Sequence, residues 1–530
     1  MAALGLVITT GTAAAQAQLR VTTTAGPIEG VAGSEGQRVF KGIPYAAPPV
    51  GTLRWKAPQP LTPWTAVRKA DTFGAQCHQP PVFGDIVFDR PASEDCLFLN
   101  VWTPAATASA KLPVMVWIHG GGYQAGASHE PRHDGTALAR KGVVLVTLNY
   151  RLGVFGFFAH PALSKEDPKG SSGNYGLMDM TAALRWVRDN AAAFGGDPGN
   201  VTIFGESAGS FAVSTLMAAA PARGLFHKAI GESGAPFGSS LSIAPKSVVE
   251  GNGEKFAASI GATTLEALRL EPAEEITAAL AKWQPWFSPS IDGSFLTEPV
   301  AATFAAGKQA QVPLLAGWNA DESRAAVTLG REPTTAASFV AATRKRFGAD
   351  ADAILSVYPA GSDTEAVESA AALASDSFIG YSTWKWIETH RASGAPVYRY
   401  LFSREIPIAP GRMQNGKPVT AADIGARHAG EIEYVFGTLD SVKGVTWTDG
   451  DRTLSGTIGS YWTNFARTGD PNGKGLQAWP RLQASQPGAM QDMGPRMLDL
   501  DTTVSAVPEP HRSRYEALDT IMSAPAAPPR

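Results

Sequence analysis

The chain has 530 residues, of which 44% are hydrophobic and 18% are charged, and its formal net charge is −3. This composition is that of an ordinary soluble globular protein, and the length allows a large buried core. The charge balance gives no basic surface for nucleic acid. Beyond the first 19 residues no unbroken apolar stretch is long enough to span a bilayer. We therefore expect neither a nucleic-acid partner nor a membrane protein.

Residues 1–18 are interpreted as the later part of a secretory signal peptide or as an alanine-rich tail. An apolar run, Ala2–Ile8, precedes A-x-A cleavage options at Ala13 with Ala15 and at Ala15 with Ala17. The cationic start of such a signal is missing, because residues 1–19 contain no Lys or Arg. The remaining residues, 19–530, are expected to form a single domain, and the protein is expected to be secreted or periplasmic.

The sequence has two cysteines, Cys77 and Cys96. In an exported protein they can pair, and closing a loop of this size would stabilise the fold by about 3 kcal/mol. Two buried thiols are the alternative, and export favours the disulfide.

The first elements read as β structure. Residues 19–30 suggest a hairpin, residues 40–51 are rich in Pro and Gly and suggest an ordered loop, and residues 93–102 bring the first clear strand. Val114–Ile118 and Val143–Leu148 are continuous apolar runs, which is typical of strands buried on both faces of a parallel sheet.

A strand and helix pattern continues to the C-terminal half. A helix is expected over Met180–Phe194, and further strands over Lys228–Ile230, Val312–Ala316 and Val397–Phe402. Residues 240–390 are helical and alanine-rich, which suits a cap over one edge of the sheet. This alternation predicts an α/β fold with a large, mostly parallel central sheet and helices on both faces.

A strand that breaks sharply into a helix delivers a serine at Gly205-Glu206-Ser207-Ala208-Gly209. In a G-x-S-x-G elbow the serine occupies strained backbone angles, and the two glycines remove side chains that would collide with neighbouring backbone. The following helix favours negative charge at its N-terminus. Ser207 is therefore the candidate nucleophile.

A glycine-rich loop, His119-Gly120-Gly121-Gly122, follows directly on the strand that ends at Ile118. Backbone N–H groups can converge on one oxygen there, as in the oxyanion loops of lipases and esterases. A flexible glycine turn is the alternative, and the order of the two motifs favours the oxyanion loop.

With these motifs the chain resembles the type-B carboxylesterases, the α/β-hydrolase family that includes cholinesterases and bacterial para-nitrobenzyl-type esterases. The similarity runs from about Gly26 to Asn472. It rests on the segments Phe40–Pro49, Ser93–Trp102, His119–Gly122, Asn149–Gly153, Phe194–Gly209 and Tyr461–Ala466. The resemblance implies an α/β-hydrolase fold with helical insertions that form a cap and an active-site gorge.

The resemblance also implies the partners of the serine. The family's acidic residue falls on Glu322 in Gly317–Ser323, with Asp321 as the second choice, and Ser323 departs from the family's glycine. The family's base precedes E-I-E-x-V-F-G and falls on His428. The order Ser207, Glu322, His428 is the order of this fold.

Further roles are implied by the family. The amides of Gly121, Gly122 and Ala208 are expected to bind the oxyanion, and Cys77 and Cys96 are expected to form a disulfide. Ser233 matches a serine that the family places near the triad, although a buried structural hydroxyl is an equal alternative.

A second histidine pattern is His129-Glu130-Pro131-Arg132-His133, which fits the zinc signature H-E-x-x-H. Pro131 disfavours the helix that would align both histidines, so no metal is expected. The alternatives are that His129, Arg132 and His133 bind a substrate carboxylate at the rim of the site, or that they form a solvated loop.

The substrate is less clearly indicated. Trp283, Trp286 and Phe287 lie where the family builds its acyl pocket, although core packing explains aromatic residues equally well. No tryptophan lies between Cys77 and Cys96, which disfavours a choline ester. The sequence also resembles bacterial fumonisin esterases, which remove tricarballylate side chains from a mycotoxin.

We therefore expect a serine carboxylesterase that acts on a small-molecule ester through an acyl-enzyme and needs no cofactor. Its activity should fall as His428 becomes protonated below about pH 6.5. The alternatives are a catalytically silent adhesion or binding domain of the same fold, a lipase, and a zinc peptidase. The oligomeric state cannot be predicted.

Overall fold

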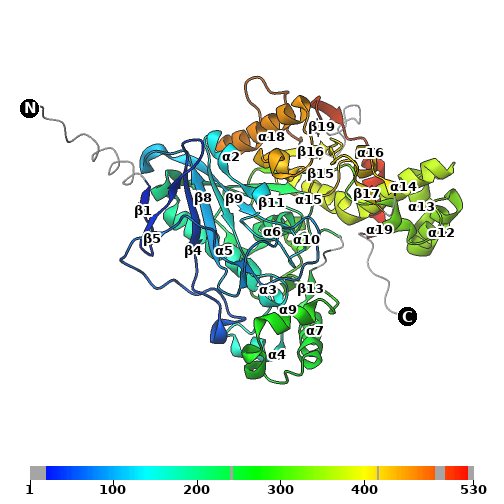
Figure 1. Ribbon diagram of the computed structural model, residues 1–530. Coiled ribbons are helices and arrows are strands. Elements are labelled where there is room, and N and C mark those ends of the chain that lie inside the picture. Colours follow the sequence, from blue (N-terminus) through cyan, green and yellow to red (C-terminus); the bar gives the residue numbers. More distant parts are fainter. Residues whose placement is uncertain (1–18, 239–240, 242, 415–416, 484–495, 523–530) are drawn as a thin grey trace, which may run out of the picture. The chain divides into compact units, whose positions relative to one another are not determined.

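The computed structural model describes residues 19–238, 241, 243–414, 417–483 and 496–522 (Figure 1). The interpretation of residues 1–18 as a signal peptide or tail lies outside these residues. Within the described ranges, no helix combines the length and the apolar character needed to cross a membrane.

The strands and helices alternate along most of the chain. The strands are β1 (Arg20–Thr22), β2 (Pro27–Glu29), β3 (Val31–Ala32), β4 (Arg38–Pro44), β5 (Arg68–Lys69), β6 (Gln76–Cys77), β7 (Ala92–Ser93), β8 (Phe98–Thr103), β9 (Leu112–Ile118), β10 (Val144–Leu148), β11 (Gly196–Glu206), β12 (Lys228–Glu232), β13 (Ala244–Pro245), β14 (Ser290–Ile291), β15 (Leu314–Asn319), β16 (Val397–Phe402), β17 (Met413–Gln414), β18 (Lys417–Pro418), β19 (Arg496–Leu500) and β20 (Ser505–Pro508).

The α-helices are α2 (Thr136–Arg140), α3 (Gly153–Phe157), α4 (Pro161–Glu166), α5 (Tyr175–Asn190), α6 (Ala208–Ala218), α7 (Lys246–Ser259), α8 (Leu265–Leu270), α9 (Ala273–Leu280), α10 (Val300–Ala305), α11 (Ala325–Leu329), α12 (Ala336–Phe347), α13 (Ala351–Val357), α14 (Asp363–Ser375), α15 (Tyr381–Arg391), α16 (Ala421–Ile424), α17 (Ile432–Phe436), α18 (Asp449–Thr468) and α19 (Arg512–Met522). A π-helix, η7 (Asp376–Gly380), joins α14 to α15.

The chain forms two compact units, each assembled from several segments. Among the described residues, unit 1 comprises those within 1–203, 221–227 and 244–297, and unit 2 comprises those within 204–220, 228–243 and 298–530. Strand β11 crosses the boundary, since its last three residues belong to unit 2. A single domain over residues 19–530 remains a prediction.

In unit 1 the main sheet has the strand order β3-β4-β8-β10-β9-β11. Strands β9 and β10 are parallel, whereas β8 is antiparallel to both β10 and β4. The side chains of Val114–Ile118 in β9 are buried along their whole length, because both faces of this strand are covered.

In unit 2 the order continues from the end of β11 through β12, β15, β16, β19 and β20. The pairs from β12 to β19 are parallel, and β20 closes the edge as an antiparallel strand. Because β11 belongs to both series, eleven of the described strands form one mixed sheet, and the others form smaller sheets of two or three strands. This confirms the predicted α/β-hydrolase fold.

Helices cover both faces of the sheet in unit 2. Successive residues of a strand point to opposite faces, so Gly231 and Glu232 in β12 face different layers. A Cβ atom on Gly231 would lie 2.2 Å from the ring of Trp386 in α15. On the other face, the indole N–H of Trp462 in α18 donates to Glu232 at 2.7 Å.

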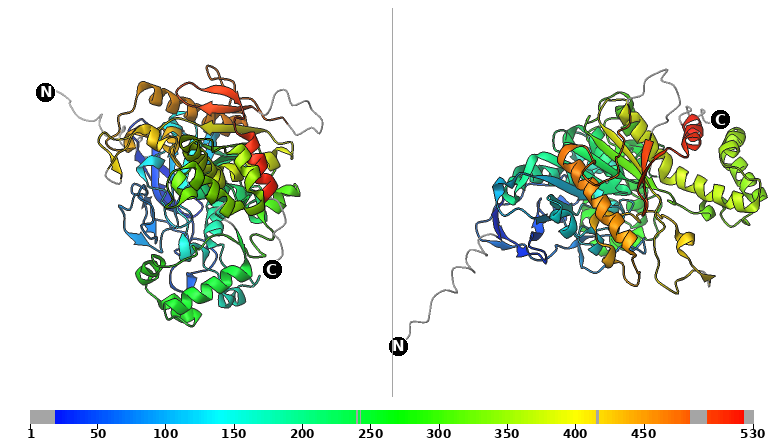
Figure 2. Two further views of the ribbon diagram at one scale, coloured as in Figure 1. Left: turned by 90° about the vertical axis from the view of Figure 1, so that its right-hand side faces the viewer. Right: turned by 90° about the horizontal axis from the view of Figure 1, so that it is seen from above.

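Another group of helices in unit 2 consists of α12, α13 and α14, which lie together with α19 beside them (Figures 1 and 2). The described residues between 240 and 390 are mainly helical, which confirms the helical nature predicted for this stretch. Its role as a cap, and the active-site gorge, remain predictions.

Two local expectations were wrong. Residues 40–44 belong to strand β4 rather than to a loop. The pairing of β4 with β8 shifts register between Phe40 and Ile43, and this irregularity accommodates Gly42 within the strand. The helix expected from Met180 begins earlier, at Tyr175, and its alanine-rich end, Ala191–Phe194, is a 3₁₀ turn.

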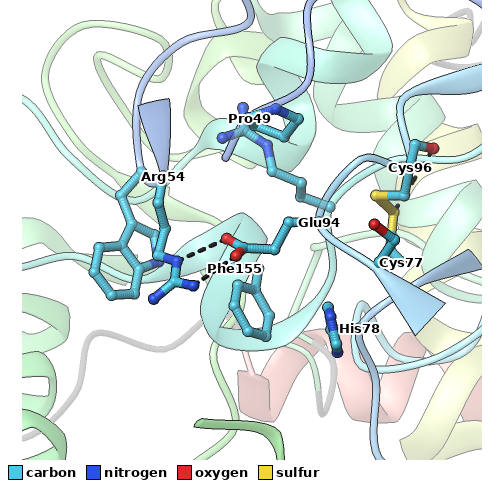
Figure 3. Close-up of a pocket in the computed structure, with 10 residues that line it drawn as sticks. Pro49, Arg54, Cys77, His78, Glu94, Cys96 and Phe155 are labelled. Carbon is cyan, nitrogen blue, oxygen red and sulfur yellow. Dashed lines mark hydrogen bonds and ion pairs between the residues drawn. A yellow bond between two sulfur atoms is a disulfide. The ribbon is translucent and has the colours of Figure 1, made fainter. Parts of the chain in front are cut away.

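The disulfide between Cys77 and Cys96 is present and both cysteines are buried (Figure 3). Beside it lies a small pocket that Arg54, Glu94 and Phe155 also line. The guanidinium of Arg54 donates to both carboxylate oxygens of Glu94, at 2.7 and 2.5 Å. A bidentate pair of this kind fixes the geometry of both side chains, so the disulfide and the ion pair both constrain this part of unit 1.

We expect the double variant Cys77→Ser, Cys96→Ser to unfold at a lower temperature than the native protein. The bond closes a loop between positions 19 apart, so its loss should cost about 3 kcal/mol in the chain-entropy model. Thermal unfolding followed by circular dichroism measures the difference. An unchanged midpoint would contradict a stabilising role.

Candidate active site

Ser207 lies at the turn between β11 and α6, where the sequence predicts a strained elbow. Its backbone angles are φ 53° and ψ −124°, a conformation that non-glycine residues rarely adopt. The turn is held by a hydrogen bond of 2.9 Å from the Ser207 amide to the carbonyl of Glu232 in the neighbouring strand. The side chain is thereby projected from the end of the strand.

The structure brings Ser207, His428 and Glu322 together in unit 2. His428 Nε2 lies 2.9 Å from Ser207 Oγ, and Nδ1 lies 2.5 Å from Glu322 Oε2. Glu322 is buried, and its other oxygen, Oε1, accepts a hydrogen bond of 2.7 Å from the backbone N–H of Asn319. The two ring nitrogens are therefore occupied by a hydroxyl on one side and a carboxylate on the other.

The loops that carry Glu322 and His428 run side by side. A parallel β-bridge joins Asp321 to Arg427, and the Asp321 amide donates to the Ala426 carbonyl at 3.0 Å. The carboxylate of Asp321, the second choice for the acid, accepts from the Ala426 amide at 2.8 Å. Asp321 thus ties the two loops together, whereas Glu322 contacts the imidazole.

A cluster of carboxylates surrounds His428. Glu206 Oε1 lies 3.3 Å from His428 Nε2, and Glu431 accepts a hydrogen bond of 2.6 Å from the Asn319 side chain. Glu232 lies in the same cluster and is fully buried. Sequence reasoning did not identify these residues, although Glu206 and Glu431 stand inside the motifs that carry Ser207 and His428.

The carboxylate cluster alters the pKa values within it. Burial alone lowers the pKa of His428, but the negative charges of Glu206, Glu322 and Glu431 outweigh it and raise this pKa above its ordinary value of 6.5. Burial raises the pKa of Glu431 to about 7, and it raises the pKa of Glu232 well above 4.5. Protons are therefore retained at this site to higher pH than ordinary side chains allow.

Ser233 lies at the edge of this cluster. Its hydroxyl is 3.5 Å from Glu431 Oε1, and its amide donates to the Gly317 carbonyl at 2.9 Å. Ser233 is fully buried and has a positive φ of 57°. The structure therefore places it beside a carboxylate that acts on the pKa of His428.

The glycine loop after β9 belongs to unit 1. Gly121 and Gly122 have positive φ values of 96° and 61°, and a Cβ atom on Gly121 would lie only 2.0 Å from the Ala125 carbonyl. Side chains are excluded here, as expected for an oxyanion loop. Ala208, the third predicted donor, is the first residue of α6 in unit 2.

The three aromatic residues predicted for an acyl pocket differ in their surroundings in unit 1. The rings of Trp283 and Phe287 each lie 5.3 Å from the ring of Phe256, in the packing of the helices. Trp286 is 39% exposed and packs edge to face on Phe83. A Cβ atom on Gly122 would lie 3.3 Å from Trp286, so this side chain borders the glycine loop.

The H-E-x-x-H segment does not form an α-helix, because Pro131–His133 is a single 3₁₀ turn. His129, Arg132 and His133 are buried rather than solvated, and His129 and Arg132 pair with Asp89 and Asp85. Burial lowers the pKa of both histidines. These three side chains are buried, two of them already pair with aspartates, and the lowered pKa values favour neutral histidines. This arrangement does not favour the predicted contact with a substrate carboxylate.

No group of three or more His, Cys, Asp or Glu residues that could hold a metal ion occurs in the part of the chain that the structure describes. In these described residues a serine with strained backbone angles, an imidazole and a buried carboxylate lie in one line of hydrogen bonds.

The chain belongs to the carboxylesterase family, whose model matches residues 17–497. It is a carboxylic ester hydrolase by this membership.

Named relatives span nearly the whole chain. The fumonisin B1 esterase of Sphingopyxis macrogoltabida is 38% identical over 87% of this chain and 84% of its own length. The para-nitrobenzyl esterase of Bacillus subtilis is 36% identical over 92% and 96%. A solved structure of a thermophilic para-nitrobenzyl esterase superposes with a TM-score of 0.78 and 34% identity over 94% of this chain and all of its own.

We expect Glu206→Gln to lower the pKa of His428 by about one unit or more, because a negative charge 3.3 Å from Nε2 is removed. The imidazole is then deprotonated at lower pH, so the acidic limb of the activity profile moves to lower pH. Titration of His428 by NMR and the pH dependence of kcat/KM measure both effects.

Asp440→Asn is the matched control, because this carboxylate is exposed and pairs with Arg452 on the surface. A midpoint that stays in place or rises in Glu206→Gln would show that Glu206 does not set the pKa of His428.

Proposed function

We propose that this protein hydrolyses carboxylic esters with Ser207 as nucleophile, His428 as general base and Glu322 as the acid that orients the base. The observation that carries the proposal is the unbroken path from Glu322 Oε2 through His428 to Ser207 Oγ, with contacts of 2.5 and 2.9 Å. A base must lie within hydrogen-bond reach of the proton that it removes, and Nε2 does.

The reaction has two halves. His428 Nε2 takes the hydroxyl proton as Ser207 Oγ bonds to the ester carbonyl carbon, and the proton passes to the alkoxide as the carbon–oxygen bond to the alcohol breaks. Water then attacks the acyl-enzyme, gives its proton to His428, and the acid leaves as the proton returns to Ser207. Glu322 stabilises the imidazolium in both halves.

Negative charge develops on the carbonyl oxygen in each half. We assign its stabilisation to the amides of Gly121, Gly122 and Ala208. Gly121 and Gly122 carry no side chains, and Ala208 stands at the N-terminus of an 11-residue helix, where free amides and the helix dipole favour an anion.

For the substrate we propose an ester whose acyl group carries free carboxylates, of the tricarballylate type. The named fumonisin B1 esterase is a relative that supports this class. A second support is Arg427, next to the base: it is half-buried, and its guanidinium lies 3.1 Å from the His428 carbonyl. A cation that is hydrogen-bonded to the backbone of the base favours an anionic acyl group nearby.

Two alternatives have different requirements. A silent binding domain of this fold would need no ordered serine, histidine and acid, so the observed contacts argue against it. A lipase would prefer emulsified long-chain esters to soluble ones. Export of the protein remains part of the proposal, and a disulfide is consistent with an oxidising compartment.

We expect Ser207→Ala and His428→Ala each to lower kcat by a factor of about 10⁴ or more, because the residues of a triad act as a unit. Glu322→Gln should also lower kcat strongly. Asp321→Asn is the matched control and should remain within about tenfold of the native enzyme. Equal losses in the Glu322 and Asp321 variants would overturn the assignment of the acid.

We expect the tricarballylate ester to give the highest kcat/KM in a panel of short-acyl, long-acyl and tricarballylate esters of one alcohol, with the long-acyl ester supplied both in solution and as an emulsion. Arg427→Gln should lower kcat/KM for the tricarballylate ester by about tenfold and leave neutral esters within twofold, since only the anion loses a partner. Preference for neutral esters would identify a general carboxylesterase, and preference for emulsions would identify a lipase.

A further inference from the structure

A π-helix lies beside the loops that carry Glu322 and His428. Segment η7 (Asp376–Gly380) interrupts the α-helical path from α14 to α15, within unit 2. Single π turns inside α-helices cost stability and occur frequently at functional sites. The extra residue rotates the side chains of this turn relative to those of α14. The contacts of these side chains therefore indicate the role of the π turn.

The side chain that η7 presents to the triad is Phe378. Its ring centroid lies 5.2 Å from that of His428, with an interplanar angle of 69°, which is an edge-to-face contact. Phe378 as a whole is half-buried. The imidazole of His428 thus has a packing partner besides its two hydrogen-bond partners.

The residue before η7 contacts the loop of the acid. Ser375 Oγ accepts a hydrogen bond of 3.0 Å from the Ser323 amide, directly after Glu322, and donates to the Ser323 carbonyl at 3.3 Å. The segment 375–380 therefore contacts both loops of the triad, at Ser323 through Ser375 and at His428 through Phe378.

The start of η7 is anchored from the other side. The carboxylate of Asp376 is buried, accepts from the Tyr358 hydroxyl at 2.7 Å and forms an ion pair of 2.9 Å with Arg514 in α19. Tyr515, the next residue of α19, packs edge to face on Trp318 in β15, the strand that leads to Glu322. A rigid path thus runs from α19 to the triad.

We propose that η7 is a positioning element of the active site, in which Phe378, fixed through Asp376, holds the imidazole of His428 in line with Ser207 and Glu322. Phe378 is a positioning residue and takes no part in proton transfer. An imidazole must rotate little between Ser207 Oγ and the leaving alkoxide, and an ordered ring beside it limits that rotation. The inference rests on the proposed function of the triad.

The test compares Phe378→Leu, Phe378→Tyr and the control Phe347→Leu, whose half-buried ring lies at the end of α12. The substrate is 4-nitrophenyl acetate, which is small and neutral, and each variant is checked by thermal unfolding. We expect Phe378→Leu to lower kcat about fivefold or more with KM within twofold. Phe378→Tyr, which keeps the ring, should restore kcat to within twofold, and Phe347→Leu should leave it unchanged.

A change in KM alone would overturn the proposal, because it would make Phe378 a substrate contact. An unchanged kcat in Phe378→Leu, or an equal loss of kcat in Phe347→Leu, would also overturn the proposal. If Ser207→Ala stays active the triad itself is wrong, whereas an inactive Ser207→Ala with a fully active Phe378→Leu rejects only the role of η7.

A double-mutant cycle tests the anchor. Asp376→Asn keeps the shape of the side chain but removes the charge that pairs with Arg514. Because Asp376 acts through Phe378, we expect the losses in kcat of Asp376→Asn and Phe378→Leu to be less than multiplicative when combined. Fully multiplicative losses would show that the two residues act independently and would overturn the path.

Discussion

The imidazole of His428 is the part of unit 2 on which the site depends. It contacts a hydroxyl at one nitrogen, a buried carboxylate at the other and an aromatic ring at its side. Each partner comes from a different segment of the chain, and a separate structural feature holds each segment in place. The elbow holds Ser207, the bridge between Asp321 and Arg427 aligns the two loops, and the π-helix supports the ring.

Much of this arrangement could be predicted from the sequence. Buried parallel strands are continuous apolar runs, and the elbow and the glycine loop are local patterns with a steric cause, so the fold and the choice of Ser207 as candidate nucleophile followed from the residues themselves. The candidate acid and base could not be derived locally. Glu322 and His428 are 106 positions apart, and only the likeness to a known family selected them.

The features that sequence reasoning missed depend on tertiary structure. A π-helix has no sequence signature, so the contact of Phe378 could not be foreseen. The H-E-x-x-H segment was expected at a rim or in solvent, yet its side chains are buried, and Asp89 and Asp85 from another loop pair with His129 and Arg132. A basic residue can be identified in a sequence, but the sequence does not reveal whether a nearby carboxylate already pairs with it in the fold.

The buried carboxylates couple folding to proton uptake. Glu431 has a pKa of about 7 in the fold and an ordinary value of 4.5, so between these two pH values its carboxyl holds more protons in the folded chain than in the unfolded one. Glu232 and His428 also have raised pKa values, so all three contribute stability at low pH that is lost as the pH rises through the folded pKa. A base needs the opposite condition, since it acts only when deprotonated. At low pH, where the raised pKa values of these groups stabilise the fold, the imidazole of His428 is protonated and cannot take up a further proton.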